Sequence, residues 1–260
     1  MSDTRTFMAA ILRRPTELGA IAPSSKALAK RAVTPVPTAG SPIVIELGPG
    51  GGVVTDAIHA RLPAEGRLLA VEHSDEMVRH LRRTRPWLNV IHGDATELVD
   101  LMRAEGVHQA DAIISTLPWT LFNDDTQVRL LNQITSLLTP GGKFVTILTL
   151  TAWPFPGARR FRRRLNQAFG DVVTTSPVWG NVPPALLYMC GRPQHIPVRG
   201  HDGAAEGVGE EASAGPAEAK TEAQIEAQAE TGAKAGVEAG VEAGAGTAGS
   251  EPADLPRGHG

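Results

Sequence analysis

Short apolar runs alternate with helix-like patterns along residues 43–191 of the chain. Five of these runs are apolar enough to be strands covered on both faces, as in a parallel sheet. They occupy residues 43–47, 67–72, 88–92, 110–114 and 143–148. Helical patterns separate them, at about 53–62, 74–84, 95–105, 130–138 and 157–168. The alternation predicts βαβ units and an open, Rossmann-like, mostly parallel sheet with helices on both faces.

The pattern changes after residue 168. Two more strands are predicted at residues 172–176 and 186–190, joined by a short segment that is rich in turn-forming residues. Such a short connection favours an antiparallel pair at one edge of the sheet. The predicted fold is therefore of the α/β class, with seven strands and an antiparallel last pair.

Composition divides the chain into a basic body and an acidic tail. Residues 1–200 carry a net charge of +6 and all 11 aromatic residues, whereas residues 201–260 carry −9, and 28 of those 60 residues are Gly or Ala. A segment without large apolar groups cannot offset its ordering entropy by burial. We therefore expect an N-terminal helical segment at 1–35, an α/β domain at 36–192 and a disordered acidic tail at 193–260.

The sequence also makes several classes of protein unlikely candidates for this chain. The single cysteine, Cys190, excludes a disulfide framework and a Cys-rich metal site, and no metal site of any kind is predicted. No apolar run approaches the ~18 residues of a membrane span, and the N-terminus lacks the apolar core of a signal peptide. We therefore expect a cytoplasmic enzyme or binding protein.

A glycine-rich loop follows the first predicted strand and opens a helix. It contains Gly48, Gly50 and Gly52, and it is preceded by Glu46. The Gly-x-Gly-x-Gly spacing is tighter than that of the dinucleotide-binding fingerprint. A carboxylate at Glu46 would repel a pyrophosphate but would suit an ammonium or sulfonium group. The loop therefore favours a cationic ligand without phosphates.

Two further acids follow the next predicted strands. Glu72 closes the second strand, where a carboxylate can accept hydrogen bonds from both ribose hydroxyls of an adenosine. Asp94 and Ala95 follow the third strand, where an acid can accept from the adenine amino group. Acids at three consecutive strand ends predict a ligand that is adenosyl-bearing and cationic, namely S-adenosylmethionine.

Residues 43–191 resemble the class I S-adenosylmethionine-dependent methyltransferases. The resemblance implies a seven-stranded sheet with an antiparallel final pair. It also implies that the first-strand acid and the glycines hold the methionine part, the second-strand acid the ribose, and the acid after the third strand the adenine. The implied cofactor-binding residues are Glu46, Gly48, Gly50, Gly52, Glu72, Asp94, Ala95 and Ser115.

The fourth strand ends in Ser115-Thr116-Leu117-Pro118-Trp119. This segment resembles the Asn/Asp/Ser-x-x-Pro-aromatic box of methyltransferases that act on amino nitrogen. The resemblance implies that the Ser115 side chain and the Leu117 carbonyl accept hydrogen bonds from the nitrogen, and that Trp119 after Pro118 packs beside the methyl group, with a cation–π contribution. The alternative is a proline-containing turn after a buried strand, with the indole in the core.

Two families of amine methyltransferases resemble the chain in different parts. The glycine loop resembles that of the rRNA adenine dimethyltransferases at residues 45–50. Residues 7–29, 46–55, 114–118 and 178–185 resemble the bacterial phospholipid N-methyltransferases, and the Trp-x-Asn-x-Pro-Pro-Ala turn at 178–185 is the most specific motif. That resemblance implies that Trp179 and Asn181 shape the acceptor pocket and that Pro23 and Ser24 cover the cofactor.

Basic and apolar residues also predict contact with an anionic membrane. Residues 5–14 form a short amphipathic pattern of the interfacial kind, and Arg residues surround Phe161 in a second cluster at 159–164. Each cation near an anionic leaflet contributes about 1 kcal/mol. RNA phosphates would attract the same arginines. The residues assigned to the membrane or the lipid substrate are Phe7, Ile11, Arg13, Arg14, Arg160, Arg163, Trp179 and Asn181.

The sequence therefore predicts an S-adenosylmethionine-dependent N-methyltransferase. We expect it to act on the amine of phosphatidylethanolamine or a related amino lipid, as a cytoplasmic enzyme that associates peripherally with the membrane surface. One alternative is an RNA methyltransferase similar to the rRNA adenine-N6 dimethyltransferases. The other is a non-catalytic interaction module that binds S-adenosylmethionine.

Overall fold

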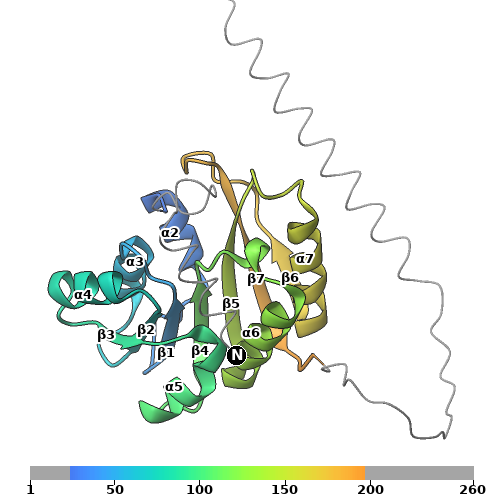
Figure 1. Ribbon diagram of the computed structural model, residues 1–260. Helices are drawn as coiled ribbons and strands as arrows, with labels where there is room; N and C mark the ends of the chain where they lie inside the picture. The colour runs from blue at the N-terminus through green and yellow to red at the C-terminus, as the bar shows by residue number, and fades with distance from the viewer. Residues whose placement is uncertain (1–23, 197–260) are drawn as a thin grey trace, which may run out of the picture. The chain divides into compact units, whose positions relative to one another are not determined.

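A seven-stranded sheet forms the centre of the computed structural model, which describes residues 24–196 (Figure 1). The strand order is β3-β2-β1-β4-β5-β7-β6. The first five strands pair in parallel, and β7 runs antiparallel to both β5 and β6, so the predicted fold class is confirmed. The strands are β1 (Ile43–Leu47), β2 (Arg67–Glu72), β3 (Asn89–His92), β4 (Ala110–Ser115), β5 (Leu138–Thr149), β6 (Phe169–Thr174) and β7 (Ala185–Pro193).

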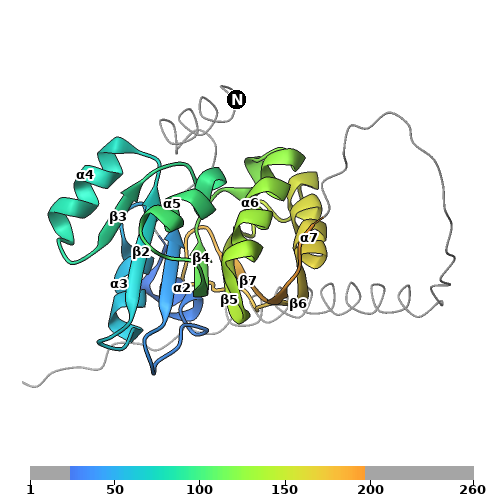
Figure 2. The same ribbon diagram turned by 90° about the horizontal axis from the view of Figure 1, so that it is seen from below.

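Helix α2 precedes the sheet, and helices fill the connections from β1 to β6 (Figure 2). They are α2 (Lys26–Ala32), α3 (Val53–Arg61), α4 (Asp75–Thr84), α5 (Leu98–Ala104), α6 (Asp124–Leu137) and α7 (Pro156–Ala168), with 3₁₀ turns η1 (Ala95–Glu97) and η2 (Trp119–Leu121). Side-chain caps fix three of the α-helix starts: Ser25 accepts from the Leu28 N–H at 3.2 Å before α2, Ser74 from the Met77 N–H at 3.4 Å before α4, and Asn123 from the Thr126 N–H at 2.8 Å before α6. The helix expected at 95–105 is η1 followed by α5.

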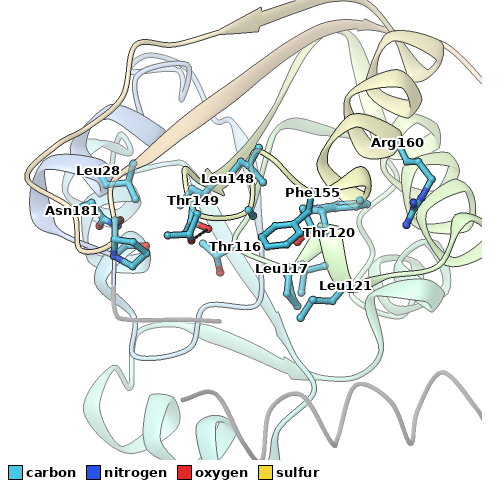
Figure 3. A pocket seen from close by; sticks show the side chains of 18 of the residues that line it. Leu28, Thr116, Leu117, Thr120, Leu121, Leu148, Thr149, Phe155, Arg160 and Asn181 are labelled. Atoms are coloured by element: carbon cyan, nitrogen blue, oxygen red, sulfur yellow. Dashed lines mark hydrogen bonds between the residues drawn. The ribbon is translucent and has the colours of Figure 1, made fainter. Parts of the chain in front are cut away.

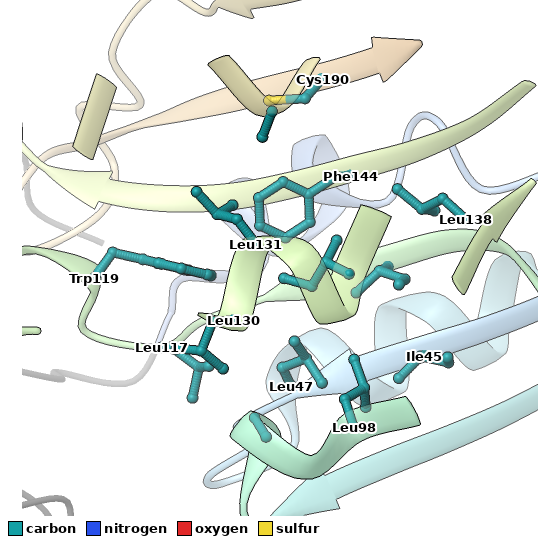
Figure 4. Close-up of a cluster of buried hydrophobic side chains, with 14 of the residues drawn as sticks. Ile45, Leu47, Leu98, Leu117, Trp119, Leu130, Leu131, Leu138, Phe144 and Cys190 are labelled. Atoms are coloured by element: carbon teal, nitrogen blue, oxygen red, sulfur yellow. The ribbon is translucent and has the colours of Figure 1, made fainter. Parts of the chain in front are cut away.

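The two faces of the sheet pack against different helices. Ile45 and Leu47 of β1 belong to the largest buried cluster, which includes residues of α5, α6 and α7 (Figure 4). Val44 and the buried residues of α2 and α3 form a second cluster on the other face, and Ala70 packs with α4 in a third. Because alternate residues of each strand face opposite sides, the parallel strands are apolar at nearly every position.

The fifth strand begins earlier than the sequence pattern predicts. Helix α6 ends at Leu137, and β5 begins directly at Leu138 rather than at residue 143. The first residues of β5 form a bulge against β4, because Ala110 pairs with Leu138 while Ala112 pairs with Lys143. A Cβ on Gly142 would lie 3.1 Å from the Ala110 carbonyl oxygen, so the close backbone approach at the bulge favours glycine.

The strand order places a candidate ligand site at the carboxyl ends of β1 and β4. From β1 the chain proceeds outward through β2 to β3, and it then crosses back to β4 and continues outward in the opposite direction. In open α/β sheets, ligands bind in the crevice where the strand order reverses.

None of the helices within residues 24–196 is long and apolar enough to cross a membrane.

Candidate functional site

Glu46 is a buried carboxylate near the end of β1. Its Oε2 accepts a hydrogen bond from the Thr55 hydroxyl at 2.6 Å, and its Oε1 has no hydrogen-bond partner among the residues that the structure describes. Burial raises the pKa of Glu46 to about 8, while the Thr55 hydrogen bond and the positive charge of Arg85 act to lower it. A buried acceptor without a donor is unfavourable, so an ammonium group would fit here.

The glycine-rich loop turns sharply through left-handed backbone conformations. Gly50 has φ 53°, and a Cβ there would meet no atom nearer than 4.0 Å, so a ligand can approach its backbone. Gly52 has φ 82°, but a Cβ there would lie 2.3 Å from Cζ of Arg85. The two glycines therefore serve different purposes: Gly50 leaves its surroundings open, and Gly52 makes room for an arginine of the protein itself.

Arg85 is a residue of the site that the sequence analysis missed. It follows α4, and its guanidinium makes two hydrogen bonds to the Asp56 carboxylate in α3, at 2.6 and 2.7 Å. This interaction raises the pKa of Arg85. The pair holds the start of α3 in place below Gly52. No local pattern could have indicated it, because the two residues are 29 positions apart in the sequence.

Glu72 connects the end of β2 to the glycine loop. One carboxylate oxygen accepts from the Ser74 backbone N–H at 2.8 Å, and the other accepts from the Gly50 N–H at 3.3 Å. The side chain is 3% exposed. An acid in this position orders the loop and keeps its remaining lone pairs available for hydroxyl donors.

Asp94 lies at the carboxyl end of β3 and begins η1. Its Oδ1 accepts from the Thr96 backbone N–H at 2.9 Å, and Ala95 is buried beside it. The three predicted acids are therefore at the ends of three adjacent strands. These positions and the unpartnered oxygen of Glu46 fit S-adenosylmethionine, which carries a cationic methionine part and an adenosine.

Thr116 joins the end of β4 to the same loop. Its backbone N–H donates to the Leu47 carbonyl at 3.0 Å, and its hydroxyl donates to the carbonyl of Gly48. The same residue lines a pocket on the other side of β4. The cofactor-binding residues and the pocket are thus directly connected through a residue that the sequence analysis did not assign.

The pocket has a volume of about 640 Å³ and lies at the ends of β4 and β5 (Figure 3). Most of the lining is apolar, with hydroxyl groups of several threonines, and Arg160 is the one charged residue among those that line it in the described part of the chain. Leu117 and Pro118 line it as well. The full lining is Ser24, Leu28, Thr116, Leu117, Pro118, Trp119, Thr120, Leu121, Ile147, Leu148, Thr149, Thr151, Ala152, Phe155, Pro156, Gly157, Arg160, Asn181 and Pro183.

Ser115 and Trp119 have structural contacts that differ from the expectation. The buried Ser115 hydroxyl accepts from the Trp119 indole N–H at 3.0 Å and from the Leu117 N–H at 3.3 Å. The indole is 1% exposed and stacks on Phe161, with ring centroids 4.7 Å apart. These contacts agree with the alternative named in the sequence analysis, a turn with the indole in the core, because burial and ring contacts stabilise so large a side chain. Trp119 also lines the pocket, so the roles of Ser115 and Trp119 at the acceptor nitrogen stay predictions.

The Leu117 carbonyl is still an acceptor at the pocket. It accepts a hydrogen bond from the Trp119 backbone N–H at 2.9 Å. A carbonyl oxygen has two lone pairs, so it can accept a second hydrogen bond from an amine. The Thr116 hydroxyl likewise keeps acceptor capacity while it donates to Gly48. These two oxygens remain for orienting a nitrogen.

Asn181 holds the start of the described chain against the β6–β7 connection. Its Oδ1 accepts from the Ser25 N–H at 2.7 Å, and its Nδ2 donates to the Pro183 carbonyl at 2.7 Å. It lines the pocket, as does Ser24, which the resemblance had placed over the cofactor. Trp179 is 72% exposed and is not among the residues that line the pocket.

The arginines of α7 divide into paired and unpaired side chains. Arg160 and Arg164 lie 3.4 and 3.5 Å from the carboxylate of Asp124, the first residue of α6. Arg163 is exposed. The other predicted membrane residues, Phe7, Ile11, Arg13 and Arg14, lie outside the described residues, as does Pro23.

Comparisons with known proteins show which proteins this chain is similar to. A family described as a methyltransferase domain matches residues 44–142. The ornithine lipid N-methyltransferase of Singulisphaera acidiphila is 32% identical over 193 residues, which cover 73% of this chain and 96% of that protein. The "Probable ribosomal RNA small subunit methyltransferase A" of Thermococcus onnurineus is 37% identical over 84 residues, 32% of this chain and 27% of that protein.

Solved structures agree with the fold. The crystal structure of TrmN from Thermus thermophilus superimposes with a TM-score of 0.50 at 16% identity, covering 64% of this chain and 48% of that one. At this identity the likeness concerns the arrangement of strands and helices. In sequence, the match to the ornithine lipid N-methyltransferase of Singulisphaera acidiphila covers more of this chain than the match to the Thermococcus onnurineus protein does.

Proposed function

Because the chain belongs to the class I S-adenosylmethionine-dependent methyltransferases, we propose that it methylates the amine of an amino lipid. Its methyl donor is S-adenosylmethionine. The observation that carries the proposal is the apolar pocket, which adjoins the cofactor-binding residues through Thr116 and has Arg160 as its charged residue. Phosphatidylethanolamine and ornithine-type lipids are the substrates that we propose.

The head groups of these lipids share two features that the pocket suits. Each has a primary amine within a few bonds of an anion, which is a phosphate in one case and a carboxylate in the other. An arginine can form charge-assisted hydrogen bonds with either anion. The relative from Singulisphaera acidiphila, an ornithine lipid N-methyltransferase, supports the same class of substrate.

The pocket can prepare the amine for reaction. When bound, S-adenosylmethionine supplies an electrophilic methyl group. The acceptor nitrogen must be neutral, and apolar walls disfavour its ammonium form by desolvation, which lowers the pKa of the amine. The Leu117 carbonyl and the Thr116 hydroxyl can accept hydrogen bonds from the N–H groups. Proximity and exclusion of water then supply much of the rate enhancement.

The proposed substrate also defines where the enzyme would work. We propose a cytoplasmic enzyme that associates peripherally with an anionic membrane surface. The predicted interfacial helix at residues 5–14 and the exposed Arg163 on α7 support this proposal by their charge.

A direct test uses purified protein, labelled S-adenosylmethionine and several acceptors in parallel. The acceptors are vesicles of phosphatidylglycerol with phosphatidylethanolamine, vesicles of phosphatidylglycerol with ornithine lipid in its place, vesicles of phosphatidylglycerol alone, and ribosomal RNA. We expect label in the lipid fraction only where the lipid carries a primary amine. Glu72→Gln is the control for cofactor-dependent transfer.

Label in RNA alone would overturn the lipid proposal and favour the RNA methyltransferase alternative. The partial match to the ribosomal RNA methyltransferase of Thermococcus onnurineus makes that acceptor the relevant comparison. Failure of every acceptor, with intact binding of S-adenosylmethionine, would instead favour a non-catalytic binding module.

A further inference from the structure

Large apolar side chains are exposed around the mouth of the pocket. Phe155, Trp179 and Val182 are 62%, 72% and 78% exposed. The other large apolar side chains that are strongly exposed in residues 24–196, Trp87 and Val173, lie before β3 and in β6. The three most exposed of the five thus belong to two loops at the pocket, and we call these three the apolar rim.

The two loops are adjacent. One follows β5 and leads to α7, and the other connects β6 to β7; both lie at the same end of the sheet (Figure 1). The Leu150 N–H donates to the Pro184 carbonyl at 2.8 Å, which joins them directly. Phe155 from one loop and Asn181 and Pro183 from the other line the pocket. The apolar rim therefore borders the entrance to the proposed substrate site.

Positive charge lies next to the apolar rim. Helix α7 begins directly after Phe155 and contains five arginines and no acidic residue. Asp124 pairs with Arg160 and Arg164, but no carboxylate of the described residues lies within 4.0 Å of Arg159 or Arg163, both of which are exposed. Apolar side chains and uncompensated arginines thus occur together on the surface at the pocket.

We propose that the apolar rim inserts into the interfacial region of an anionic lipid bilayer, so that the pocket opens onto the lipid. This inference rests on the proposed function and adds the surface through which the enzyme meets its substrate. Tryptophan favours the membrane interface because it has an apolar body and a polar N–H. The arginines of α7 complement an anionic leaflet.

A bilayer fits the apolar rim better than a protein partner does. A stable protein interface buries about 800 Å² on each partner, with a contiguous apolar centre. Here three protruding side chains surround an opening and are flanked by unpaired charge of one sign. Insertion of these side chains would let an amino lipid enter the pocket without first passing through water.

The test compares two matched double variants for binding to phosphatidylglycerol–phosphatidylethanolamine vesicles. Trp179→Glu with Val182→Glu alters the apolar rim, and Trp87→Glu with Val173→Glu makes the same changes elsewhere on the surface. Phe155 is kept, because it lines the pocket. We expect vesicle affinity to fall by about tenfold or more for the first pair and less than about twofold for the second. Thermal unfolding checks that both pairs fold.

A second substrate separates this inference from the proposed function. Short-chain phosphatidylethanolamine below its micellar concentration presents the amine without a bilayer. We expect the variant of the apolar rim to methylate it at the wild-type rate while losing activity on vesicles, because neither Trp179 nor Val182 lines the pocket. Failure of the wild type on both forms of the lipid would overturn the proposed function.

Two results would overturn the inference about the apolar rim alone. One is equal vesicle binding by the two double variants, with wild-type activity on lipid. The other is loss of vesicle binding on deletion of residues 1–23, with full binding by the variant of the apolar rim, because the N-terminal segment would then suffice. A blue shift of tryptophan emission on vesicles that Trp179→Phe abolishes and Trp87→Phe retains would support insertion.

Discussion

The carboxyl edge of the sheet has two halves that bind through different physical means. At the ends of β1, β2 and β3 there are buried carboxylates, and backbone N–H groups or a hydroxyl hold each of them in place. At β4 and β5, the site is an apolar pocket of about 640 Å³. The first half suits a charged, hydroxyl-bearing ligand that forms hydrogen bonds, whereas the second suits a ligand bound by shape and by removal of water.

Polar side chains therefore have different purposes in the two halves. Glu46 and Glu72 keep oxygen atoms or lone pairs available for a ligand. Ser115 and Asn181 use theirs on the protein itself, one to hold the Trp119 indole and the other to hold Ser25. Substitutions in the first half should change cofactor affinity, and those in the second should change stability.

Removal of the Trp119 ring should have the largest effect. The indole is fully buried between Phe161, Phe122 and Phe144. Trp119→Ala should lower the free energy of unfolding by about 3–5 kcal/mol, because the ring leaves a cavity. Urea denaturation measures this. Trp87→Ala, at a site that is 44% exposed, should cost less than about 1 kcal/mol.

The same residue tests whether the indole acts on the substrate or only in the core. Trp119→Phe keeps an aromatic core side chain but loses the indole N–H that donates to Ser115. If the ring is structural, the turnover number should stay within about threefold of the wild type once the protein is folded. A fall of more than about 100-fold, with unchanged stability, would place the ring beside the reacting methyl group after all.

Substitution of Glu72 should have the next largest effect, and it should fall on cofactor affinity. Its two oxygens accept from the backbone N–H groups of Ser74 and Gly50. Glu72→Gln replaces one acceptor by a donor that would face an N–H. We expect S-adenosylmethionine to bind about 100-fold more weakly in isothermal titration calorimetry. Glu76→Gln, the same change at an exposed position in α4, should leave affinity unaltered.

Glu46 should make stability and cofactor binding depend on pH. Burial raises its pKa from an ordinary 4.5 to about 8, so between these values the folded protein binds a proton that the unfolded chain releases. The contribution to stability is therefore full below pH 4.5 and is lost as pH rises through about 8, by up to ~1.4 kcal/mol per pH unit. Glu46→Gln should remove this dependence in urea denaturation of the cofactor-free protein.

Binding of a cation next to Glu46 should reverse the preference of the carboxyl group. An ammonium favours the carboxylate, so S-adenosylmethionine should release close to one proton when it binds near pH 7. Calorimetry in buffers of different ionisation enthalpy measures that number. If binding neither releases nor takes up a proton, the proposed contact between Glu46 and the ammonium group would be contradicted.

The two halves also differ in how well the sequence predicts them. The acids of the cofactor half could be placed because each follows an apolar run, so its position at a strand end is determined locally. The bulge near the start of β5 could not, because it depends on the approach of Gly142 to Ala110. The contact between Arg85 and Asp56 likewise joins residues that are 29 positions apart in the sequence.

The acceptor half is harder to predict for a related reason. The segment from Ser115 to Trp119 is compatible with either a substrate-binding box or a turn with a buried ring. The packing of Phe161 from α7 against the indole favours the turn, and only the tertiary fold brings these residues together. Thr116, within the same segment, is the residue that contacts both the glycine loop and the pocket.

Ser115→Ala should have the smallest effect, and this prediction separates the two halves most sharply. The hydroxyl accepts from the Trp119 indole, so its removal leaves a buried N–H without a partner and should cost about 1 kcal/mol of stability. Turnover should stay within about threefold of the wild type, because Leu117 and Thr116 keep the acceptors at the pocket. Ser136→Ala, which removes an exposed hydroxyl, is the control. A fall of about 100-fold in turnover at unchanged stability would show that Ser115 acts on the substrate nitrogen, and the acceptor half would then bind by hydrogen bonds as the cofactor half does.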